Sequence, residues 1–396
     1  MPAASASSLS ADEQLHWLAL RMTPGLGAKT AIQLVEAFRT PQALFRASKS
    51  EIEAAGASVG VARNISSGCA FEDAVTQQQR LAESGAFIVP VGSKHYPAQL
   101  KEIYDPPPVL FARGRVELLE TLAIAVVGTR HPTTYGTTVA GRLATDLSNA
   151  GLTIASGMAR GIDTAAHKAV LEAGGNTIAV FGCGVDELYP AENKKLAAQL
   201  AESGLILSDF PMGTPPYPQN FPIRNRIISG ISLGVLIVEG GQYSGSAITA
   251  RLAAEHGREV FAVPGNVTSK MSWGPNLLIK QGAKLVQDWN DVVTELQPAD
   301  RRWLVDRCRQ QLSLEESNDP VTNSEAGASA VVDQMTEVGR ACLFSLKTDA
   351  PVALDHLVES LQPHSASEII AALFELELSG LVRQLPGKSF LRVWLG

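Results

Sequence analysis

The chain has 396 residues, of which 45% are hydrophobic and 18% are charged. This length is typical of two or three domains, and the apolar content is sufficient for a buried core in each of them. The formal net charge of −7 is opposite in sign to the basic excess of most nucleic-acid-binding proteins. Nucleic-acid binding would therefore require arginine and lysine residues to gather on one face.

The amino-terminal stretch MPAASASSLSADEQ has neither the basic nor the apolar segment of a secretory signal. The longest apolar runs, such as LAIAVV, have the length of a strand and fall far short of the ~18 residues that a membrane span needs. The four cysteines lie far apart without a CxxC pair, so we expect reduced thiols and no zinc site. These features predict a cytoplasmic protein without a membrane span.

The first block, 1–105, is mainly helical in pattern. A helical face from Leu15 to Met22 is followed by the glycine turn 24–27 (PGLG) and a second helical stretch. Such a turn between two helices is typical of a helix-hairpin-helix unit, in which backbone amides approach a phosphate and Lys29 adds positive charge. A helical interaction domain, in which the glycines only make the turn, is the alternative, because few basic residues lie near the turn.

The second block, 106–297, alternates strand and helix patterns. The predicted strands are 122–128, 152–156, 177–182, 205–210, 233–240 and 259–265. The predicted helices between them are about 136–150, 161–173, 192–203, 222–231 and 246–256. Repeated β-α-β units predict an α/β fold with a parallel sheet covered on both faces. Right-handed crossovers put the carboxyl ends of the strands at one edge, where ligands of such sheets bind.

The third block follows a segment of low apolar content. Residues 310–330 carry no aromatic residue and little periodic apolar content, and 298–334 are predicted to be a flexible linker. From about 335, three helical patterns precede a strand pair around Pro386 and Gly387. This order predicts a winged-helix domain over 335–396.

Five turns of the second block fall at predicted strand ends or helix starts, and between them they carry glycine, hydroxyl and arginine residues. They are Gly128–Arg130, Ser156–Asp163, Gly182–Gly184, Phe221–Arg226 and Ser244–Ser246. Glycine and serine at a helix start offer unpaired N–H groups and the positive end of the helix dipole, and arginine matches phosphate oxygens. Each arginine alone is compatible with a solvated surface residue. Arginines on several turns of one sheet edge favour an extended polyanion as ligand.

Two other classes of site fit the sequence poorly. The first turn reads GTRHPTTYG, which lacks the GxGxxG spacing of dinucleotide-binding folds, and the P-loop spacing is absent, so no cofactor is expected. Asp163 and His167 lie one helical turn apart, and we interpret them as structural: Asp163 orders the turn of Arg160 and His167 packs beside it. Because no nucleophile–base set stands out, we expect no enzyme activity.

The turns together resemble the DprA/Smf family (DNA-processing protein A). The matching stretches include VVGTRHPTTYG, SGMARGIDTAAHKAVLEAGGNTIAVFGCGVDELYP, FPIRNRIISGIS, VLIVEGGQYSGSAITARLAAEHGREVFAVPG and GPNLLIKQGA, and they span about 125–283. The flanking blocks contain none of these stretches and resemble the family only in domain type: a sterile-alpha-motif-like helical domain before the second block and a winged-helix domain after it.

The resemblance implies an extended Rossmann-like fold that binds single-stranded DNA in a basic pocket. It also implies a homodimer that protects incoming DNA in natural transformation (competence) and loads a RecA-type recombinase onto it. Arginines 130 and 160 would contact phosphates, with Thr129 standing where the family usually has serine. The residues expected to bind DNA are Gly128, Thr129, Arg130, Ser156, Gly157, Arg160, Gly161, Lys168, Arg224, Asn225, Arg226, Ser244, Gly245 and Ser246.

The winged-helix block has a charge unsuited to a reader of duplex DNA. Residues 335–396 contain five basic and seven acidic residues. The predicted recognition helix carries Glu368, Glu375 and Glu377 and no lysine or arginine, whereas a groove reader needs positive charge there. We therefore expect this domain to contact protein or to have a regulatory role.

Two further functions stay open from the residues alone. Rossmann-like phosphoribohydrolases similar to the lysine decarboxylase-like proteins also carry glycine-rich phosphate turns. The stretch 239–246 (EGGQYSGS) resembles their PGGxGT motif loosely, because no proline precedes the glycines and no glutamate begins the helix after Ser246. A scaffold protein whose pocket holds no nucleic acid is the third hypothesis.

Overall fold

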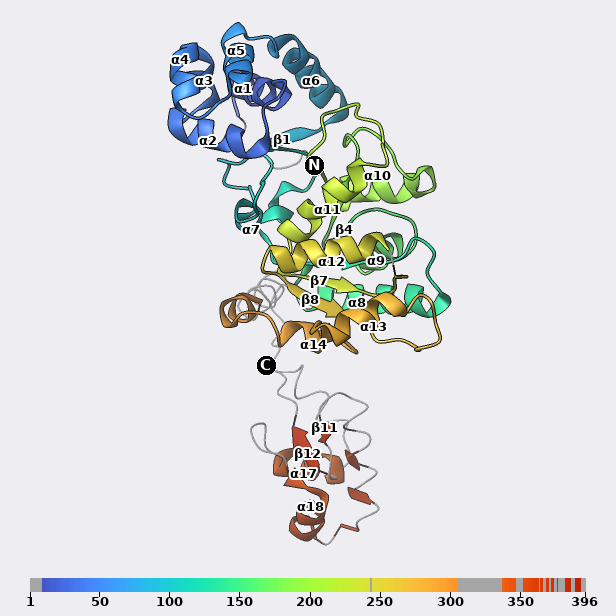
Figure 1. Ribbon diagram of the computed structural model, residues 1–396. Coiled ribbons are helices and arrows are strands. Elements are labelled where there is room, and N and C mark those ends of the chain that lie inside the picture. The colour runs from blue at the N-terminus through green and yellow to red at the C-terminus, as the bar shows by residue number, and fades with distance from the viewer. Residues whose placement is uncertain are drawn as a thin grey trace. The chain divides into compact units, whose positions relative to one another are not determined.

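The computed structural model describes residues 9–242, 244–304 and 337–346, together with shorter segments between 352 and 392 (352–362, 364–365, 368–369, 372–373, 376, 382–385 and 389–392). The chain forms two compact units, Met1–Leu312 and Ser313–Gly396 (Figure 1). In the described part of the chain, no helix is both long and apolar enough to cross a membrane.

The first unit begins with the predicted helical block. Its helices are α1 (Ala11–Met22), α2 (Ala28–Phe38), α3 (Pro41–Arg46), α4 (Lys49–Ala54), α5 (Val59–Ser67) and α6 (Phe71–Ser84). Local signals set several of their starts: Ser10 and Glu13 form a capping box at α1, and Ser48 and Glu51 form another at α4. The turn between α1 and α2 needs glycine at Gly25, whose φ is +78°.

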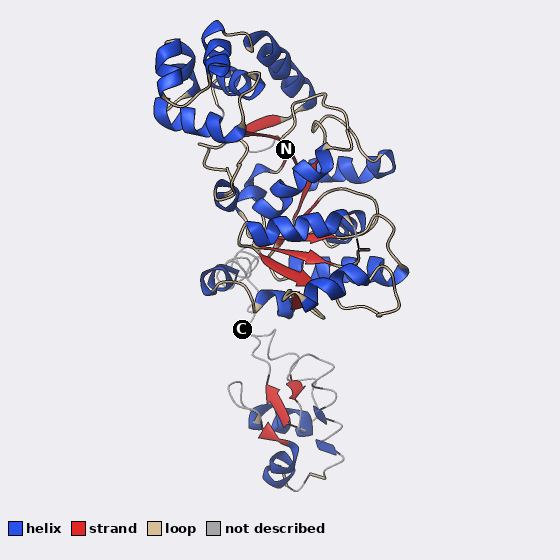
Figure 2. Ribbon diagram, viewed as in Figure 1, coloured by secondary structure: helices blue, strands red, loops and turns tan. Residues whose placement is uncertain are grey.

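A nine-stranded sheet forms the centre of the first unit (Figure 2). Its strands are β1 (Phe87–Pro90), β2 (Val109–Gly114), β3 (Ala123–Val127), β4 (Thr153–Ser156), β5 (Thr177–Phe181), β6 (Leu205–Ser208), β7 (Gly234–Ile237), β8 (Glu259–Ala262) and β9 (Lys284–Leu285). The order across the sheet is β1-β2-β6-β5-β4-β3-β7-β8-β9, and all neighbours from β6 to β9 are parallel. The parallel α/β fold is therefore confirmed, with β3 to β8 in the six predicted runs.

Helices cover both faces of this sheet. They are α7 (Ala98–Lys101), α8 (Thr134–Asn149), α9 (Ile162–Glu172), α10 (Lys194–Ser203), α11 (Asn220–Gly230), α12 (Gly245–Glu255), α13 (Trp273–Lys280) and α14 (Trp289–Val293). Alternation along β3 shows the two layers: Ile124 and Val126 pack with residues of α8 and α9, whereas Ala125 and Val127 pack with residues of α11 and α12.

The strand order places a topological switch point between β3 and β7. From β3 the chain adds β4, β5 and β6 on one side, and it then crosses to β7 on the other side of β3. The loops after β3 and β7 therefore diverge to opposite faces of the sheet. The crevice that this leaves at the carboxyl ends of the two strands is where open α/β sheets bind ligands.

Residues near the predicted block boundaries belong to the sheet region. Phe87–Pro90, predicted to lie in the helical block, is strand β1 and pairs antiparallel with β2. At the other boundary, 298–304 of the predicted linker are helical, because Leu304 is buried against the sheet region. The remaining linker residues, 305–334, lie outside the described residues. The division at 105 and 297 stays a prediction.

The helical block packs onto one face of the sheet through a shared core. A single apolar cluster runs from Trp17 of α1 to Phe181 of β5. Arg21 of α1 donates to the carbonyl of Asp209 at 2.8 Å, and its guanidinium lies 3.6 Å from the Asp209 carboxylate. Arg226 of α11 pairs with the same carboxylate at 2.5 Å. Asp209 thus joins the helical block to the sheet and to α11.

The second unit contains α17 (Glu337–Ser345), β10 (Val352–Ala353), α18 (Leu354–Ser360), β11 (Val382–Leu385) and β12 (Ser389–Arg392). The strands form an antiparallel sheet in the order β10-β12-β11. Cys342, Leu357 and Phe390 share its core. The predicted winged-helix architecture agrees with this arrangement. Of the acidic residues predicted on the recognition helix, Glu368 is exposed, and 375 and 377 lie outside the described residues.

Substitution of Asp209 tests the junction between the helical block and the sheet. Only 11% of its side chain is exposed, as for Arg226, so Asp209→Ala removes the shorter of the two ion pairs of a buried arginine and the ion pair of Arg21. We expect the free energy of unfolding, measured by urea denaturation, to fall by about 3 kcal/mol. The exposed pair of Lys49 and Glu53 is the control, and Glu53→Ala should cost at most about 0.5 kcal/mol. Equal losses in the two variants would contradict this account.

Candidate nucleic-acid interface

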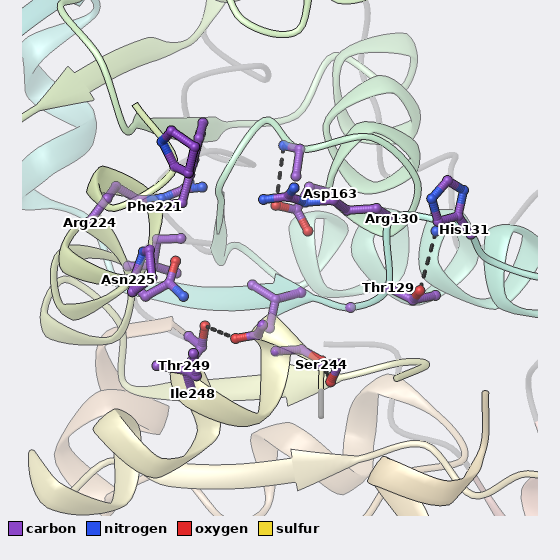
Figure 3. Close-up of a pocket in the computed structure, with 18 residues that line it drawn as sticks. Thr129, Arg130, His131, Asp163, Phe221, Arg224, Asn225, Ser244, Ile248 and Thr249 are labelled. Atoms are coloured by element: carbon purple, nitrogen blue, oxygen red, sulfur yellow. Dashed lines mark hydrogen bonds between the residues drawn. The ribbon is translucent and has the colours of Figure 1, made fainter. Parts of the chain in front are cut away.

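A pocket of about 450 Å³ lies at the switch point (Figure 3). Four segments supply its walls: 127–131 after β3, Ala159 and Asp163 around the start of α9, 218–228 on α11 and its approach, and 244–249 at the start of α12. These segments are distant in sequence and meet because the strand order places their loops at one edge. The predicted residues among the lining are Gly128, Thr129, Arg130, Arg224, Asn225, Ser244, Gly245 and Ser246.

The loop after β3 carries Arg130 into the pocket. Backbone hydrogen bonds hold this loop in place: the Thr129 amide donates to the Glu239 carbonyl at 2.7 Å, and the Thr129 carbonyl accepts from the Ile162 amide at 3.2 Å. Arg130 is exposed and extends toward Asp163 in Figure 3. Its guanidinium carbon lies 5.4 Å from the centroid of the Phe221 ring. The cation is thus available to a ligand while its loop is held on both sides.

The start of α12 forms a second wall. Ser244 is the N-cap residue, but its side chain makes no capping bond; its hydroxyl instead lies 2.7 Å from the hydroxyl of Ser246. The helix therefore begins at the pocket, with Gly245 and Ser246 at its first positions and without a side-chain cap. Backbone amides at such a helix start, together with the helix dipole, favour an anion.

Arg224 forms the back of the pocket. It is buried, and its Nη1 donates to the Val180 carbonyl at 2.5 Å. Among the described residues, its buried Nε has no hydrogen-bond partner. Burial lowers the pKa of Arg224 to about 10, and the nearby Asp163 carboxylate opposes this shift. Arg224 remains a cation at neutral pH with donor capacity left for a ligand.

Asp163 orders the loop before α9, as predicted. Burial raises the pKa of Asp163, and the positive charge of Arg224 and hydrogen bonds from backbone amides oppose this. Two of these amides belong to Gly157, at 3.1 Å, and Ala159, at 3.3 Å. His167, also predicted to be structural, is buried with its Nδ1 2.7 Å from the Thr177 hydroxyl. Burial lowers the pKa of His167 to about 3, so its ring is neutral.

Three predicted residues support the pocket from behind. Ser156 is fully buried, and its hydroxyl donates to the Val126 carbonyl at 2.6 Å. At Gly157, a Cβ would lie 2.0 Å from Nη1 of Arg224, so glycine is required for the arginine to fit. Gly161 has a φ of +81°, and a Cβ there would meet the Thr129 carbonyl at 2.4 Å. These positions shape the site without lining it.

Three predicted basic residues lie outside the pocket. Arg226 is 11% exposed and is held by Asp209 and Asp105, because it faces the junction with the helical block. Arg160 is exposed and pairs with Glu192 at 2.7 Å. Lys168 is exposed farther along α9. Arg160 and Lys168 could therefore contact a DNA strand only outside the pocket.

The structure adds lining residues that the sequence reasoning did not select. Ile248 and Thr249 lie one helical turn after Ser244 and Gly245, so the helical repeat could have identified them. His131 follows Arg130, and its amide donates to the Thr129 hydroxyl at 3.2 Å. Within the described residues, no cluster of histidine, cysteine, aspartate and glutamate is placed to hold a metal ion.

Comparison with known proteins agrees with this fold. The family model of DNA recombination-mediator protein A matches residues 87–297, and the model of the DprA winged helix domain matches 333–388. Protein Smf of Escherichia coli is 38% identical over 308 residues, which cover 78% of each chain. Protein Smf of Synechocystis sp. is 32% identical over 401 residues, covering 96% of this chain and 99% of its own.

A solved structure shows the same similarity in three dimensions. The X-ray structure of DNA processing protein A (DprA) from Streptococcus pneumoniae is 34% identical and aligns with a TM-score of 0.62. The alignment covers 72% of this chain and 98% of that one. The first family model spans the whole parallel sheet and every segment that lines the pocket. The chain therefore belongs to the DNA recombination-mediator protein A (DprA/Smf) family.

Proposed function

We propose that the chain binds single-stranded DNA in the pocket at the switch point and acts as a recombination mediator. One observation carries the proposal: Arg130, Arg224 and the uncapped start of α12 converge on a single pocket of about 450 Å³. Each of the three is a phosphate-binding element. Their convergence provides the local positive charge that the acidic composition of the whole chain conceals.

The charges in the pocket favour a phosphodiester. Among the described lining residues, the formally charged side chains are Arg130, Arg224 and Asp163. The Asp163 carboxylate accepts hydrogen bonds from two backbone amides and faces Arg224, so its negative charge is largely offset. Arg130 has no ion pair with any described carboxylate. The net formal charge of the described side chains that line the pocket is therefore positive.

The size of the pocket favours a single strand over a duplex. A volume of about 450 Å³ is that of a small-ligand site, which suits a nucleotide and excludes a base-paired helix. Phe221 lies beside Arg130 and offers an aromatic wall to an unstacked base. Bases of a duplex are already stacked and paired, so they would have to be extruded at a cost of a few kcal/mol to reach this wall.

We propose a binding function without catalysis. The alternative, a phosphoribohydrolase, would use the stretch 239–246 and its acidic residue. Glu239 is buried and accepts from the Thr133 hydroxyl at 2.6 Å and the Thr133 amide at 2.9 Å, so it holds the start of α8. Purified protein incubated with nucleoside monophosphates should release no free base, measured by chromatography.

The partners of the proposed mediator follow from the same function. A protein that holds single-stranded DNA for recombination would deliver it to a RecA-type recombinase, and we propose this loading step during natural transformation. We also propose a homodimer, located in the cytoplasm, and a winged-helix domain that contacts protein. Analytical ultracentrifugation and pull-down with a RecA-type recombinase would test the two protein contacts.

Arg130→Ala is the direct test of the pocket. Losing one guanidinium–phosphate contact should weaken binding of a labelled oligothymidylate about tenfold, in line with the ~1.5–3 kcal/mol of a charged hydrogen bond. The slope of log affinity against log salt should fall in magnitude by about 0.7. Arg301→Ala makes the same charge change at an exposed position outside the pocket and should bind normally. Equal affinity of the two variants would refute the proposal.

Glu192→Gln tests whether the bound DNA strand contacts Arg160 where it leaves the pocket. The Arg160–Glu192 pair is more than half exposed on both sides, so it is weak and competes with a phosphate for the arginine. Removing the carboxylate charge should raise affinity about twofold to fivefold at low salt. Glu53→Gln, which changes another exposed pair, is the control and should have no effect. Unchanged affinity of Glu192→Gln would place the strand away from Arg160.

A further inference from the structure

A second hollow adjoins the pocket and has no part in the site described so far. It measures about 600 Å³ and lies between α11 and α12. Pro222 and Ile248 line both hollows, so the two hollows adjoin at these residues. From these two residues the groove runs along α12 to Glu255, and the loop 102–105 closes it. Glu255 lies seven positions after Ile248 on α12, a rise of about 10 Å.

The groove presents apolar surface to solvent. Tyr104 is 79% exposed and Ile223 is 48% exposed, although both are large apolar side chains. Nζ of Lys29, at the start of α2, lies 4.7 Å from the centroid of the Tyr104 ring. Lys29 therefore covers one face of the ring, and the high exposure leaves the other face open. An open aromatic face beside a cation is suited to a base and its phosphate.

The acidic residues of the groove are already paired. Glu102 lies 3.0 Å from Arg258, Asp105 lies 3.4 Å from Arg226, and Glu255 lies 3.5 Å from Arg251. Each carboxylate therefore presents little net charge to a passing polyanion. Lys29 is exposed and has no ion pair with any described carboxylate, so its charge is not offset.

We propose that a single strand leaving the pocket continues between α11 and α12 and stacks a base on Tyr104, with Lys29 at the adjacent phosphate. This inference rests on the proposed binding of single-stranded DNA in the pocket and extends the path of the strand. Pro222 and Ile248, which line both hollows, are the residues that the strand would cross between them. The helical block then contributes to DNA binding through Lys29, which follows the glycine turn between α1 and α2.

Length dependence of binding tests this path in the full-length protein. Oligothymidylates of about 4 to about 16 nucleotides span the usual contact lengths of single-strand sites. Affinities measured by fluorescence anisotropy should increase with length in the wild type. Tyr104→Ala should lower the affinity for the longest oligomer about tenfold and leave the affinity for the shortest unchanged. Tyr104→Phe should bind all oligomers like the wild type. Because Tyr104 is exposed, its replacement should leave the urea midpoint unchanged.

A matched pair of lysine variants tests the phosphate contact. Lys29→Gln should weaken binding of the longest oligomer about twofold to fivefold and lower the magnitude of its salt slope by about 0.7. Lys49→Gln removes the same charge from the same helical block, away from the groove, and should bind like the wild type. Equal affinities of the two variants would show that Lys29 does not meet the strand.

The outcomes separate this inference from the proposed function. If Arg130→Ala binds weakly at all lengths but Tyr104→Ala binds like the wild type at all lengths, the pocket binds DNA and the groove does not. The inference would then be wrong. If the wild type fails to bind any oligomer, or Arg130→Ala binds normally, the proposed function itself fails.

Discussion

Two buried charges of opposite sign, Arg224 and Asp163, organise the candidate site. The arginine comes from α11 and the aspartate from the first turn of α9, so each charge lies on a different crossover connection, and each opposes the other's loss of charge on burial. Burying two charges is costly unless both are paired and hydrogen-bonded. Asp163 meets this condition through backbone amides, and Arg224 through the Val180 carbonyl. Among the described residues, the buried Nε of Arg224 has no hydrogen-bond partner, and the residue lines the pocket.

Helix α11 connects this site to the rest of the molecule. Arg224 and Arg226 are two positions apart, about 200° around a helix, and so point in nearly opposite directions. One serves the pocket, and the other binds Asp209 and Asp105 at the junction with the helical block. A rotation of α11 would therefore disturb both contacts together. The helical block thus helps to orient the helix that carries the buried cation of the pocket.

The distribution of charge reconciles an acidic chain with an anionic ligand. Acidic residues near the grooves are held by arginines, as in the Asp105–Arg226 and Glu102–Arg258 pairs. Arg130 and Lys29 have no such partner among the described residues: Arg130 lines the pocket, and Lys29 lies over Tyr104, which lines the adjoining groove. Net charge describes the average field of a protein, whereas binding depends on the few charges that a ligand meets at short range.

The sequence by itself determined the parallel α/β fold, the places of its strands and the turns that form the pocket, because strand periodicity and glycine, serine and arginine at strand ends are local signals. It also indicated structural roles for Asp163 and His167. Only the tertiary structure decided which arginines face a ligand. Arg226 forms ion pairs with Asp209 and Asp105, which are distant in sequence, and so does not line the pocket. The hydroxyl of Ser156 donates its hydrogen bond to the neighbouring strand β3. The meeting of Lys29 with Tyr104 likewise depends on how the helical block packs on the sheet, a long-range arrangement that local sequence patterns do not specify.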